Sequence, residues 1–284
     1  MKKTKIDWMN VIIGTILIII AIIIVVPFIN ILCLSLEPSH IADEVGRIHL
    51  IPREVSFEAY EYVLRNKNIL ISALNSVLIT LAGSLGGTMV TAMLGYGLTF
   101  KKIFGHKFIS FMVLFTMMFS GGIIPLYILI QKLGLLNTRL SLILPFMVTA
   151  YNTILMKNFF ESIPDSLAES AQLDGATEFT LFFKIILPLS KPILATIVLF
   201  YAVSRWNDYF YGMMFVTDQN CKPLQVLLRE LLLQASADSG GDTITLGKNM
   251  KMAIAIVTMA PIMVVYPFLQ KYFTKGVMLG SVKG

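Results

Sequence analysis

Charged residues are scarce in this chain. Asp, Glu, Lys and Arg make up 14% of its 284 residues, while hydrophobic residues make up 56%. A soluble domain typically has roughly 25% charged residues, and the mean hydropathy of this chain is +0.76. The composition therefore excludes an ordinary soluble domain and predicts an all-α integral membrane protein.

Residue types that carry chemistry are also few. The two cysteines, Cys33 and Cys221, are far apart and the three histidines are scattered, so neither type forms a metal or redox spacing. No HExxH, GxSxG, CxxC or P-loop pattern is present. We therefore expect no catalytic residue, and no metal or cofactor bound by the chain itself.

The chain has little acidic charge to balance its lysines, and its net charge is +6. The lysines stand at the ends of apolar runs, where the anionic surface of a membrane attracts them. We therefore expect membrane lipid, and not nucleic acid, to be the partner of this charge.

Long apolar runs are abundant, and they predict six transmembrane helices in a single membrane domain over residues 1–284. The expected spans are 11–34, 69–100, 108–130, 140–160, 192–216 and 252–273. Glycines in the second span, such as Gly83, Gly87 and Gly95, are expected to allow close helix packing. A break at Gly121-Gly122 in the third span either opens the backbone toward a cavity or ends the helix early at the surface.

The positions of the lysines predict the orientation of the chain. Six spans place both termini on one side of the membrane. Lysines cluster at the start of the first span and in the short loop 101–107, on that same side. Because basic residues near helix ends remain in the cytoplasm, we expect cytoplasmic termini, including a tail at 274–284.

The longest markedly polar interruption in the second half of the chain runs from Glu161 to Pro192. Its residues predict two short helices with a glycine hinge. Ser162 with Asp165 fits a capping box, Gly175 can end the first helix, and Thr177 can cap the second.

The second short helix of this stretch has an apolar face. Phe179, Phe182, Phe183 and Ile186 follow one another at helical spacing, and Leu187-Pro188 is expected to end the helix. A structured, partly apolar knob of this kind favours docking to a partner over catalysis.

Polar residues within the fifth span are candidates for a substrate path, because charged groups in a membrane usually face a cavity or each other. A stripe at helical spacing with Asn207 and Trp206 beside it suits a hydroxyl-rich ligand; it consists of Tyr201, Ser204, Asp208 and Tyr211. The alternative is an Arg205–Asp208 pair that only holds helices together. Weaker candidates for the same path are Asn75, Tyr151 and Asn152, each of which could instead bond between helices.

The stretch that begins at Glu161 resembles the EAA loop of binding-protein-dependent ABC importers. The family pattern is Glu-Ala-Ala, three residues, Gly, nine residues, Ile-x-Leu-Pro. This chain matches it with Glu169-Ser170-Ala171, Gly175 and Ile185-Ile186-Leu187-Pro188, and all spacings are kept. It departs from the pattern at Ser170, a small residue that should still permit docking.

Four further stretches are similar to the sugar-transporting, maltose-type branch of these permeases. They are GGIIPLYILIQKLGLLNT (121–138), LILPFMVTAYNTILMKNFF (142–160), WND (206–208) and the ending KGVMLGSVKG. The segment 217–251 resembles the group that handles complex oligosaccharides or polysaccharide fragments.

This resemblance implies a type I ABC importer fold in a multi-pass protein of the bacterial cell membrane. The loop 161–190 would carry the coupling helix that contacts an ATPase. The contact residues implied are Glu169, Ser170, Ala171, Asp174, Gly175, Ile185, Leu187 and Pro188, with Gly276 and Gly284 of the tail as a second contact.

The resemblance also implies partners. They are a different but related permease subunit, two ATPase subunits that bind ATP and Mg²⁺ and do the hydrolysis, and an extracytoplasmic binding protein that delivers a saccharide. The alternatives are an ABC permease for a non-sugar solute or an ion-coupled carrier. The first stays open because the loop indicates how transport is driven and not which solute is carried.

Overall fold

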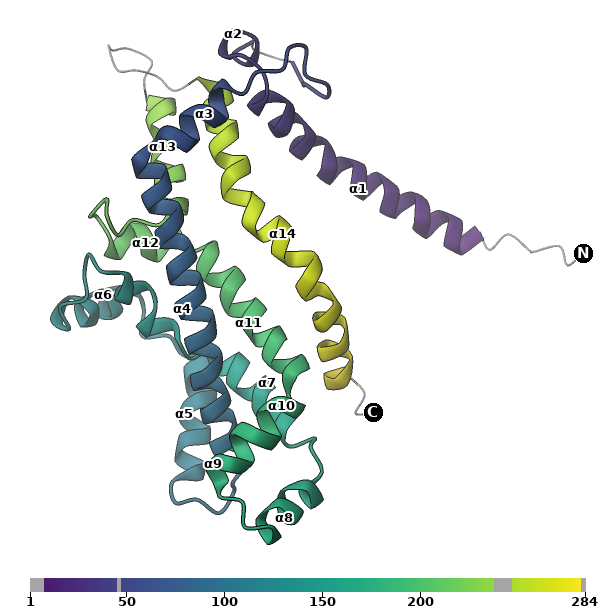
Figure 1. Cartoon of the computed structure of the whole chain (residues 1–284), viewed down its shortest axis with the longest axis vertical. Coiled ribbons are helices and arrows are strands. Elements are labelled where there is room, and N and C mark those ends of the chain that lie inside the picture. The colour runs from purple at the N-terminus through teal and green to yellow at the C-terminus, as the bar shows by residue number, and fades with distance from the viewer. Residues whose placement is uncertain (1–7, 45–46, 238–246, 282–284) are drawn as a thin grey trace, which may run out of the picture. The chain divides into compact units, whose positions relative to one another are not determined.

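The computed structural model describes residues 8–44, 47–237 and 247–281, and every regular element in these ranges is helical (Figure 1). The chain forms two compact units. The first comprises Met1–Leu70 and Leu228–Ala260, and the second comprises Ile71–Leu227 and Pro261–Gly284.

The first unit holds the N-terminal helices and parts of three helices that continue into the second. Its elements are α1 (Trp8–Ser35), α2 (Ser39–Ala42), α3 (Glu58–Arg65), the start of α4 (Lys67–Gly97), most of α13 (Leu224–Ala237) and the first part of α14 (Lys248–Ser281). Helix α1 is apolar on all sides, and its side chains are exposed along most of its length.

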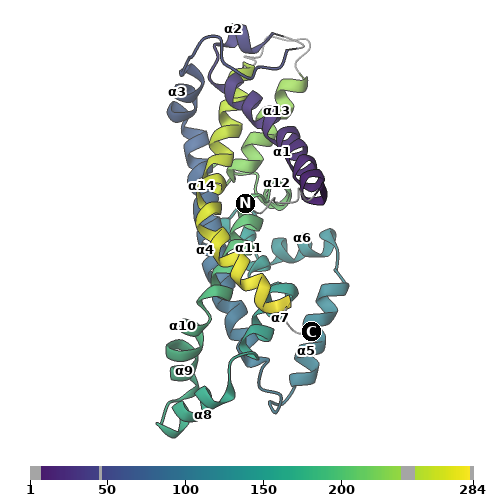
Figure 2. The ribbon, with the colours of Figure 1, turned by 90° about the vertical axis from the view of Figure 1, so that its right-hand side faces the viewer.

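The second unit holds the rest of α4, α13 and α14 and the remaining elements, some of which are single turns. They are α5 (His106–Met118), α6 (Ile123–Lys132), η1 (Arg139–Leu142), η2 (Leu144–Phe146), α7 (Ala150–Phe160), α8 (Asp165–Leu173), α9 (Glu178–Leu181), η3 (Phe182–Ile186), α10 (Leu187–Leu189), α11 (Lys191–Trp206) and α12 (Phe210–Phe215). Helix α8 lies at the opposite end of this unit from α12 (Figure 2).

Two described helices, Met9–Ser35 and Lys67–Gly97, are long and apolar enough to cross a membrane alone. Three bent pairs pass the same test together, which gives up to five crossings in the described part of the chain. The first two expected spans therefore have matching helices, while a total of six crossings stays a prediction.

The third and fourth expected spans are not single straight helices. Helices α5 and α6 meet at an angle of 119° across the expected break at Gly121-Gly122, where Gly122 has φ +87°. In the fourth, the turns η1 and η2 precede α7 with a bend of 49°. The local cause is Pro145, which lacks an N–H to continue the helix, followed by Thr149, whose side chain caps α7.

The last two expected spans also differ from the structure. The fifth, predicted as one helix over 192–216, is α11 and α12 with a break at 207–209. Side chains at the break take over helical bonding, since Asn207 Nδ2 donates to the Val203 carbonyl and Asp208 Oδ1 accepts from the Tyr211 amide. The sixth span is part of a longer helix, α14, which continues through 274–281 of the expected tail.

Close approach between helices builds the core of the second unit, as expected for the glycines of α4. A Cβ on Gly87 would lie 3.0 Å from the Met147 carbonyl oxygen, and one on Gly83 would lie 3.1 Å from Arg205 Cγ. One apolar cluster joins α4, α7, α8 and α11 through residues that include Ala92, Met156, Phe160, Ala171 and Ile197.

A side-chain clamp joins the ends of α6 and α12. Asn137 has φ +59°, a conformation that asparagine tolerates better than most residues. Its Oδ1 accepts hydrogen bonds from the Thr217 amide (2.7 Å), the Thr217 hydroxyl (2.9 Å) and the Asp218 amide (3.1 Å). The backbone amide of Asn137 donates to the Phe215 carbonyl (2.9 Å). The two connecting segments are therefore held together by four hydrogen bonds centred on one residue.

Candidate functional site

The predicted coupling loop has the expected hinge. Helix α8 ends at Leu173, and Gly175 follows with φ +82°. The Ala176 amide donates to the Ala171 carbonyl at 2.9 Å, which closes the helix end in the manner of a Schellman motif. Thr177 then caps α9 by accepting a hydrogen bond from the Thr180 amide at 3.3 Å. Both predicted helix ends are confirmed.

Two other details of the loop were predicted wrongly. Ser162 does not cap α8, because its hydroxyl donates to the Phe159 carbonyl (2.6 Å) and α8 begins after Pro164 without a side-chain cap. Leu187-Pro188 does not end the second helix. A π-helical turn, η3, precedes it, and the helix runs on through α10 to a bend at Ser190.

The π turn divides the apolar face that was expected from Phe179 to Ile186. Phe182 and Ile186 are buried in the core cluster, whereas Phe179 is 78% exposed and Phe183 is 42% exposed. A π turn inserts an extra residue into the helix and so changes which side chains share a face. Sequence spacing alone could not reveal it.

The expected ATPase-contact residues divide between the exposed and the buried side of the loop. Five of them are exposed: Glu169, Ser170, Asp174, Gly175 and Pro188. Ala171 is buried in the core cluster, and Ile185 and Leu187 are half-buried. The motif thus has an outward face and an inward face. Gly276 lies within α14, and Gly284 falls outside the described residues.

Sequence reasoning missed Leu173, which is 90% exposed at the end of α8, just before the glycine hinge. Together with Phe179 it gives the loop two apolar side chains that nothing covers in the described chain. A leucine two residues before the glycine of a polar loop was the signal that could have identified Leu173, whereas Phe179 was already expected on the apolar face. Exposed apolar groups beside polar ones favour a protein contact.

Glu178 was also missed, and it ties the loop to the membrane helices. Its Oε1 accepts a hydrogen bond from Gln172 Nε2 of α8 (2.9 Å), and its Oε2 accepts one from the Tyr96 hydroxyl of α4 (3.0 Å). One carboxylate at the start of α9 therefore connects three helices. A displacement of α8 has a direct route to α4 through this residue.

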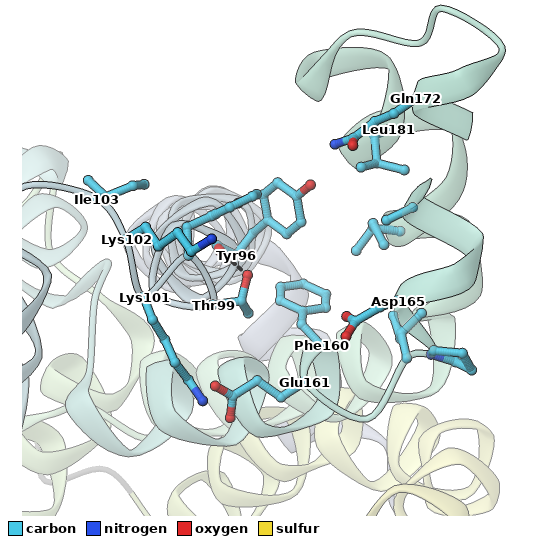
Figure 3. Close-up of a pocket in the computed structure, with 15 residues that line it drawn as sticks. Tyr96, Thr99, Lys101, Lys102, Ile103, Phe160, Glu161, Asp165, Gln172 and Leu181 are labelled. Atoms are coloured by element: carbon cyan, nitrogen blue, oxygen red, sulfur yellow. Dashed lines mark hydrogen bonds between the residues drawn. The ribbon is translucent and has the colours of Figure 1, made fainter. Parts of the chain in front are cut away.

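A hollow of about 750 Å³ lies between the end of α4, the following loop and α8. Figure 3 shows Lys101, Lys102 and Ile103 on one side of it and Asp165, Gln172 and Leu181 on the other. Tyr96 and Phe160 also line it.

The predicted path residues of the fifth span do not form one stripe, because the helix breaks after Trp206. Tyr201 is 2% exposed, and its hydroxyl lies 2.7 Å from the Thr91 hydroxyl and accepts from the Thr149 amide at 3.1 Å. Trp206 is buried as well. Ser204 and Asn207 are exposed, and Tyr211 packs against the Phe146 ring with centroids 4.6 Å apart.

Arg205 and Asp208 form a buried ion pair across the helix break. Nη1 of Arg205 lies 3.1 Å from Oδ2 of Asp208, and their side chains are only 8% and 12% exposed. The guanidinium also donates to the Leu142 carbonyl (3.2 Å) and sits 4.3 Å from the centre of the Phe146 ring. In this conformation the geometry favours the alternative in which the pair holds helices together.

The weaker path candidates separate in the same way. Asn75 is fully buried: its Nδ2 donates to the carbonyls of Asn220 (2.9 Å) and Lys222 (3.1 Å), and its Oδ1 accepts from Arg139 Nε (2.8 Å). Asn152 is buried and Tyr151 is exposed. Among the described residues, no group of three or more His, Cys, Asp or Glu is placed to hold a metal ion.

The family model described as "Binding-protein-dependent transport system inner membrane component" matches residues 101–279. The chain belongs to this permease family. It is therefore a membrane protein, and the matched region includes the coupling loop, α11 and most of α14.

Individual relatives agree with the family. The polygalacturonan/rhamnogalacturonan transport system permease protein YtcP of Bacillus subtilis (strain 168) is 41% identical over 277 residues, covering 94% of this chain and 96% of that protein. Protein LplC of the same organism is 40% identical over 240 residues, covering 83% and 81%.

A solved structure shares the fold. A chain in the crystal structure of a bacterial ABC transporter involved in the import of the acidic polysaccharide alginate superposes with a TM-score of 0.87 and is 32% identical. The match covers 96% of this permease and 99% of that chain. The all-helical architecture is thus that of an ABC importer permease.

Proposed function

We propose that this permease carries an oligosaccharide into the cytoplasm as one subunit of a type I ABC importer, driven by ATP hydrolysis on a partner ATPase. The observation that carries the proposal is the coupling loop, where a motif with family spacing is folded into two short helices that are joined at a glycine hinge and have an apolar, exposed tip. The similarity to permeases of polysaccharide importers supports a saccharide as the cargo.

The complete assembly in this proposal has a second, related permease subunit, two ATPase subunits and an extracytoplasmic binding protein. The permease crosses the bacterial cell membrane six times with both termini in the cytoplasm, and it performs no catalysis. ATP and Mg²⁺ bind to the ATPase subunits. The C-terminal residues from Gly276 to Gly284 supply a second ATPase contact.

The coupling step follows from the geometry of the loop. Leu173 and Phe179 enter a groove of the ATPase, beside Glu169, Ser170 and Asp174. When ATP closes the ATPase dimer, the force on α8 reaches α4 through Glu178 and the buried side of the loop. Rigid movement of the membrane helices then alternates the access of a central site.

The substrate path uses groups that can bond to hydroxyls or stack on sugar rings. Ser204, Asn207 and Tyr151 are exposed in the present conformation and are the first contacts in this proposal. Tyr201, Trp206, Asp208, Tyr211, Asn75 and Asn152 are engaged inside the protein, so any contact with cargo requires the rearrangement that accompanies transport.

The test is uptake by the whole complex in proteoliposomes, with the binding protein outside and ATP inside. Labelled oligogalacturonides, alginate oligomers and maltooligosaccharides are compared with an amino acid, a peptide and phosphate. We expect ATP-dependent uptake of at least one oligosaccharide class. Uptake confined to a non-sugar solute would contradict a saccharide substrate. Uptake driven by an ion gradient without ATP would contradict transport driven by ATP hydrolysis.

A further inference from the structure

The loop between α4 and α5 exposes apolar side chains next to lysines. Phe104 is completely exposed and Ile103 is 52% exposed, although both follow a long apolar helix. Lys101 and Lys102 directly precede them and are exposed too. Aromatic and basic residues at the end of a membrane helix are typical of the level of the lipid headgroups.

These lysines also form one wall of the 750 Å³ hollow. Apolar side chains, among them Phe160, Ile163 and Leu181, line the hollow beside Asp165 and Gln172 of its far side. The hollow thus pairs a cationic rim with an apolar interior. That combination fits an amphiphile with a negatively charged head.

The positive charges of Lys101 and Lys102 have no acidic partner among the described residues. Neither Lys101 nor Lys102 takes part in an ion pair among the residues that the structure describes. Of the two carboxylates that line the hollow, Glu161 is paired with Lys157 Nζ at 2.9 Å, and Asp165 lies on the α8 side. Anionic headgroups attract lysines at a membrane surface.

We propose that this hollow is a binding site for an anionic phospholipid of the adjacent leaflet. Lys101 and Lys102 hold the phosphate of the headgroup, while Ile103 and Phe104 lie among the upper acyl chains. Continuity with the membrane favours a lipid, because the loop joins α4, which is long and apolar enough to cross a membrane alone, to α5, which passes the same test together with α6. The bound headgroup also touches α8, and this consequence for coupling rests on the proposed function.

The binding site can be tested by lipid quenching. Phe104→Trp places an indole at the proposed acyl level, and the signal of the parent complex, to which this chain contributes two tryptophans, is subtracted. Vesicles of constant phosphatidylcholine and phosphatidylglycerol content carry bromine on only one of the two lipids. We expect brominated phosphatidylglycerol to quench the introduced indole more strongly than its share of the vesicle predicts.

Variants identify the source of this preference. Lys101→Gln and Lys102→Gln, each in the Phe104→Trp background, should lower it by about fivefold per lysine. The matched control is Lys132→Gln, which removes an exposed lysine that does not line the hollow, and it should leave the preference unchanged. An equal effect of all three substitutions would overturn the site, because it would reflect net charge alone.

Two further arms separate the chemistry. Equal quenching by brominated phosphatidylethanolamine and phosphatidylglycerol would overturn the anionic class. Loss of the preference on adding millimolar inorganic phosphate would assign the site to free phosphate and overturn the lipid. Absence of quenching by any brominated lipid would remove Phe104 from the bilayer and overturn the proposal.

The link to coupling has a separate readout. In the complex, ATP-dependent uptake in vesicles with and without phosphatidylglycerol should differ severalfold for the parent and little for the double variant Lys101→Gln/Lys102→Gln. If quenching shows the preference for phosphatidylglycerol but uptake does not depend on this lipid, the binding site is supported and its link to coupling is contradicted. If no uptake occurs with any cargo, the proposed function fails while the quenching result is unaffected.

Discussion

The hydroxyl oxygens of Thr91 and Tyr201 lie 2.7 Å apart in the interior of the second unit, although 110 positions separate them in the chain. The same tyrosine oxygen accepts the Thr149 amide at 3.1 Å. Residues of α4, the segment before α7 and α11 therefore meet at one hydroxyl group. Tyr201 in this conformation is a tie between helices.

Removing this hydroxyl should weaken the fold. Tyr201→Phe leaves the Thr91 hydroxyl and the Thr149 amide without this partner, at a cost of about 1 kcal/mol. The melting temperature of the purified complex in detergent should fall. Tyr127→Phe is the control, because the Tyr127 hydroxyl makes no hydrogen bond with another described residue. An unchanged melting temperature together with altered substrate selection would indicate that Tyr201 contacts the substrate.

The glycine contacts of α4 predict a second pair of variants. Gly87→Ala brings a Cβ to 3.0 Å from a backbone carbonyl oxygen that cannot move freely, whereas Gly97→Ala meets no atom within 4 Å. We expect Gly87→Ala to lower the free energy of unfolding by about 1 to 3 kcal/mol, and Gly97→Ala to have little effect. Thermal unfolding of both variants checks this, and equal stability of the two would contradict the packing.

The hinge of the coupling loop predicts a graded effect of side-chain type. Gly175 has φ +82° and open space around it, so the strain of a substitution comes from the backbone alone. Gly175→Val should cost about 1 to 2 kcal/mol locally and reduce transport. Gly175→Asn should retain most of the transport activity, since asparagine tolerates this conformation. ATP-dependent uptake is the measurement, and equal loss in both variants would show that the glycine serves contact and not conformation.

The exposed tip of the loop predicts where ATPase affinity resides. Leu173→Ala and Phe179→Ala each remove apolar area that would be buried on docking, worth about 1.5 to 3 kcal/mol when burial is complete. The affinity of the permease for the ATPase should fall by tenfold or more, with no loss of permease stability. Leu133→Ala, at a residue 60% exposed after α6, should leave affinity unchanged. Normal ATPase binding by both loop variants would remove the tip from the interface.

The Arg205–Asp208 pair predicts strong coupling between two substitutions. Losing one partner leaves the other charge buried alone, which costs about 3 to 5 kcal/mol. Arg205→Gln or Asp208→Asn alone should therefore lower stability more than the double variant does. A thermal double-mutant cycle measures the difference. Additive losses, together with weaker cargo selection in Asp208→Asn, would assign Asp208 to the path.

The sequence predicted those features that depend on neighbouring residues. Gly175 and Thr177 end and begin helices for local steric and hydrogen-bonding reasons, and the structure has both. The break at Gly121-Gly122 is local as well. The motif from Glu169 to Pro188 led to the correct family because its spacing is contained within one stretch of chain.

Other features depend on contacts between distant residues and could not be read from spacing. The burial of Asn75 is set by carbonyl groups at 220 and 222, and the burial of Trp206 depends on the packing of the unit. The helix break after Trp206 arises because Asn207 and Asp208 satisfy backbone groups with their side chains, an option that periodicity does not register. The π turn at 182–186 left no signal that hydrophobic spacing could detect.

The Asn137 clamp limits how the permease can deform. Because its four hydrogen bonds join the chain after α6 to the chain after α12, these two ends behave as one mechanical link. Relative motion during a transport cycle must then be absorbed on the far sides of the link, at residues 119–122 and 207–209, where helical bonding is already interrupted. The second of these points includes the candidate substrate contact Asn207 and follows Ser204, so part of the strain that enters from the ATPase would be released beside the proposed substrate path.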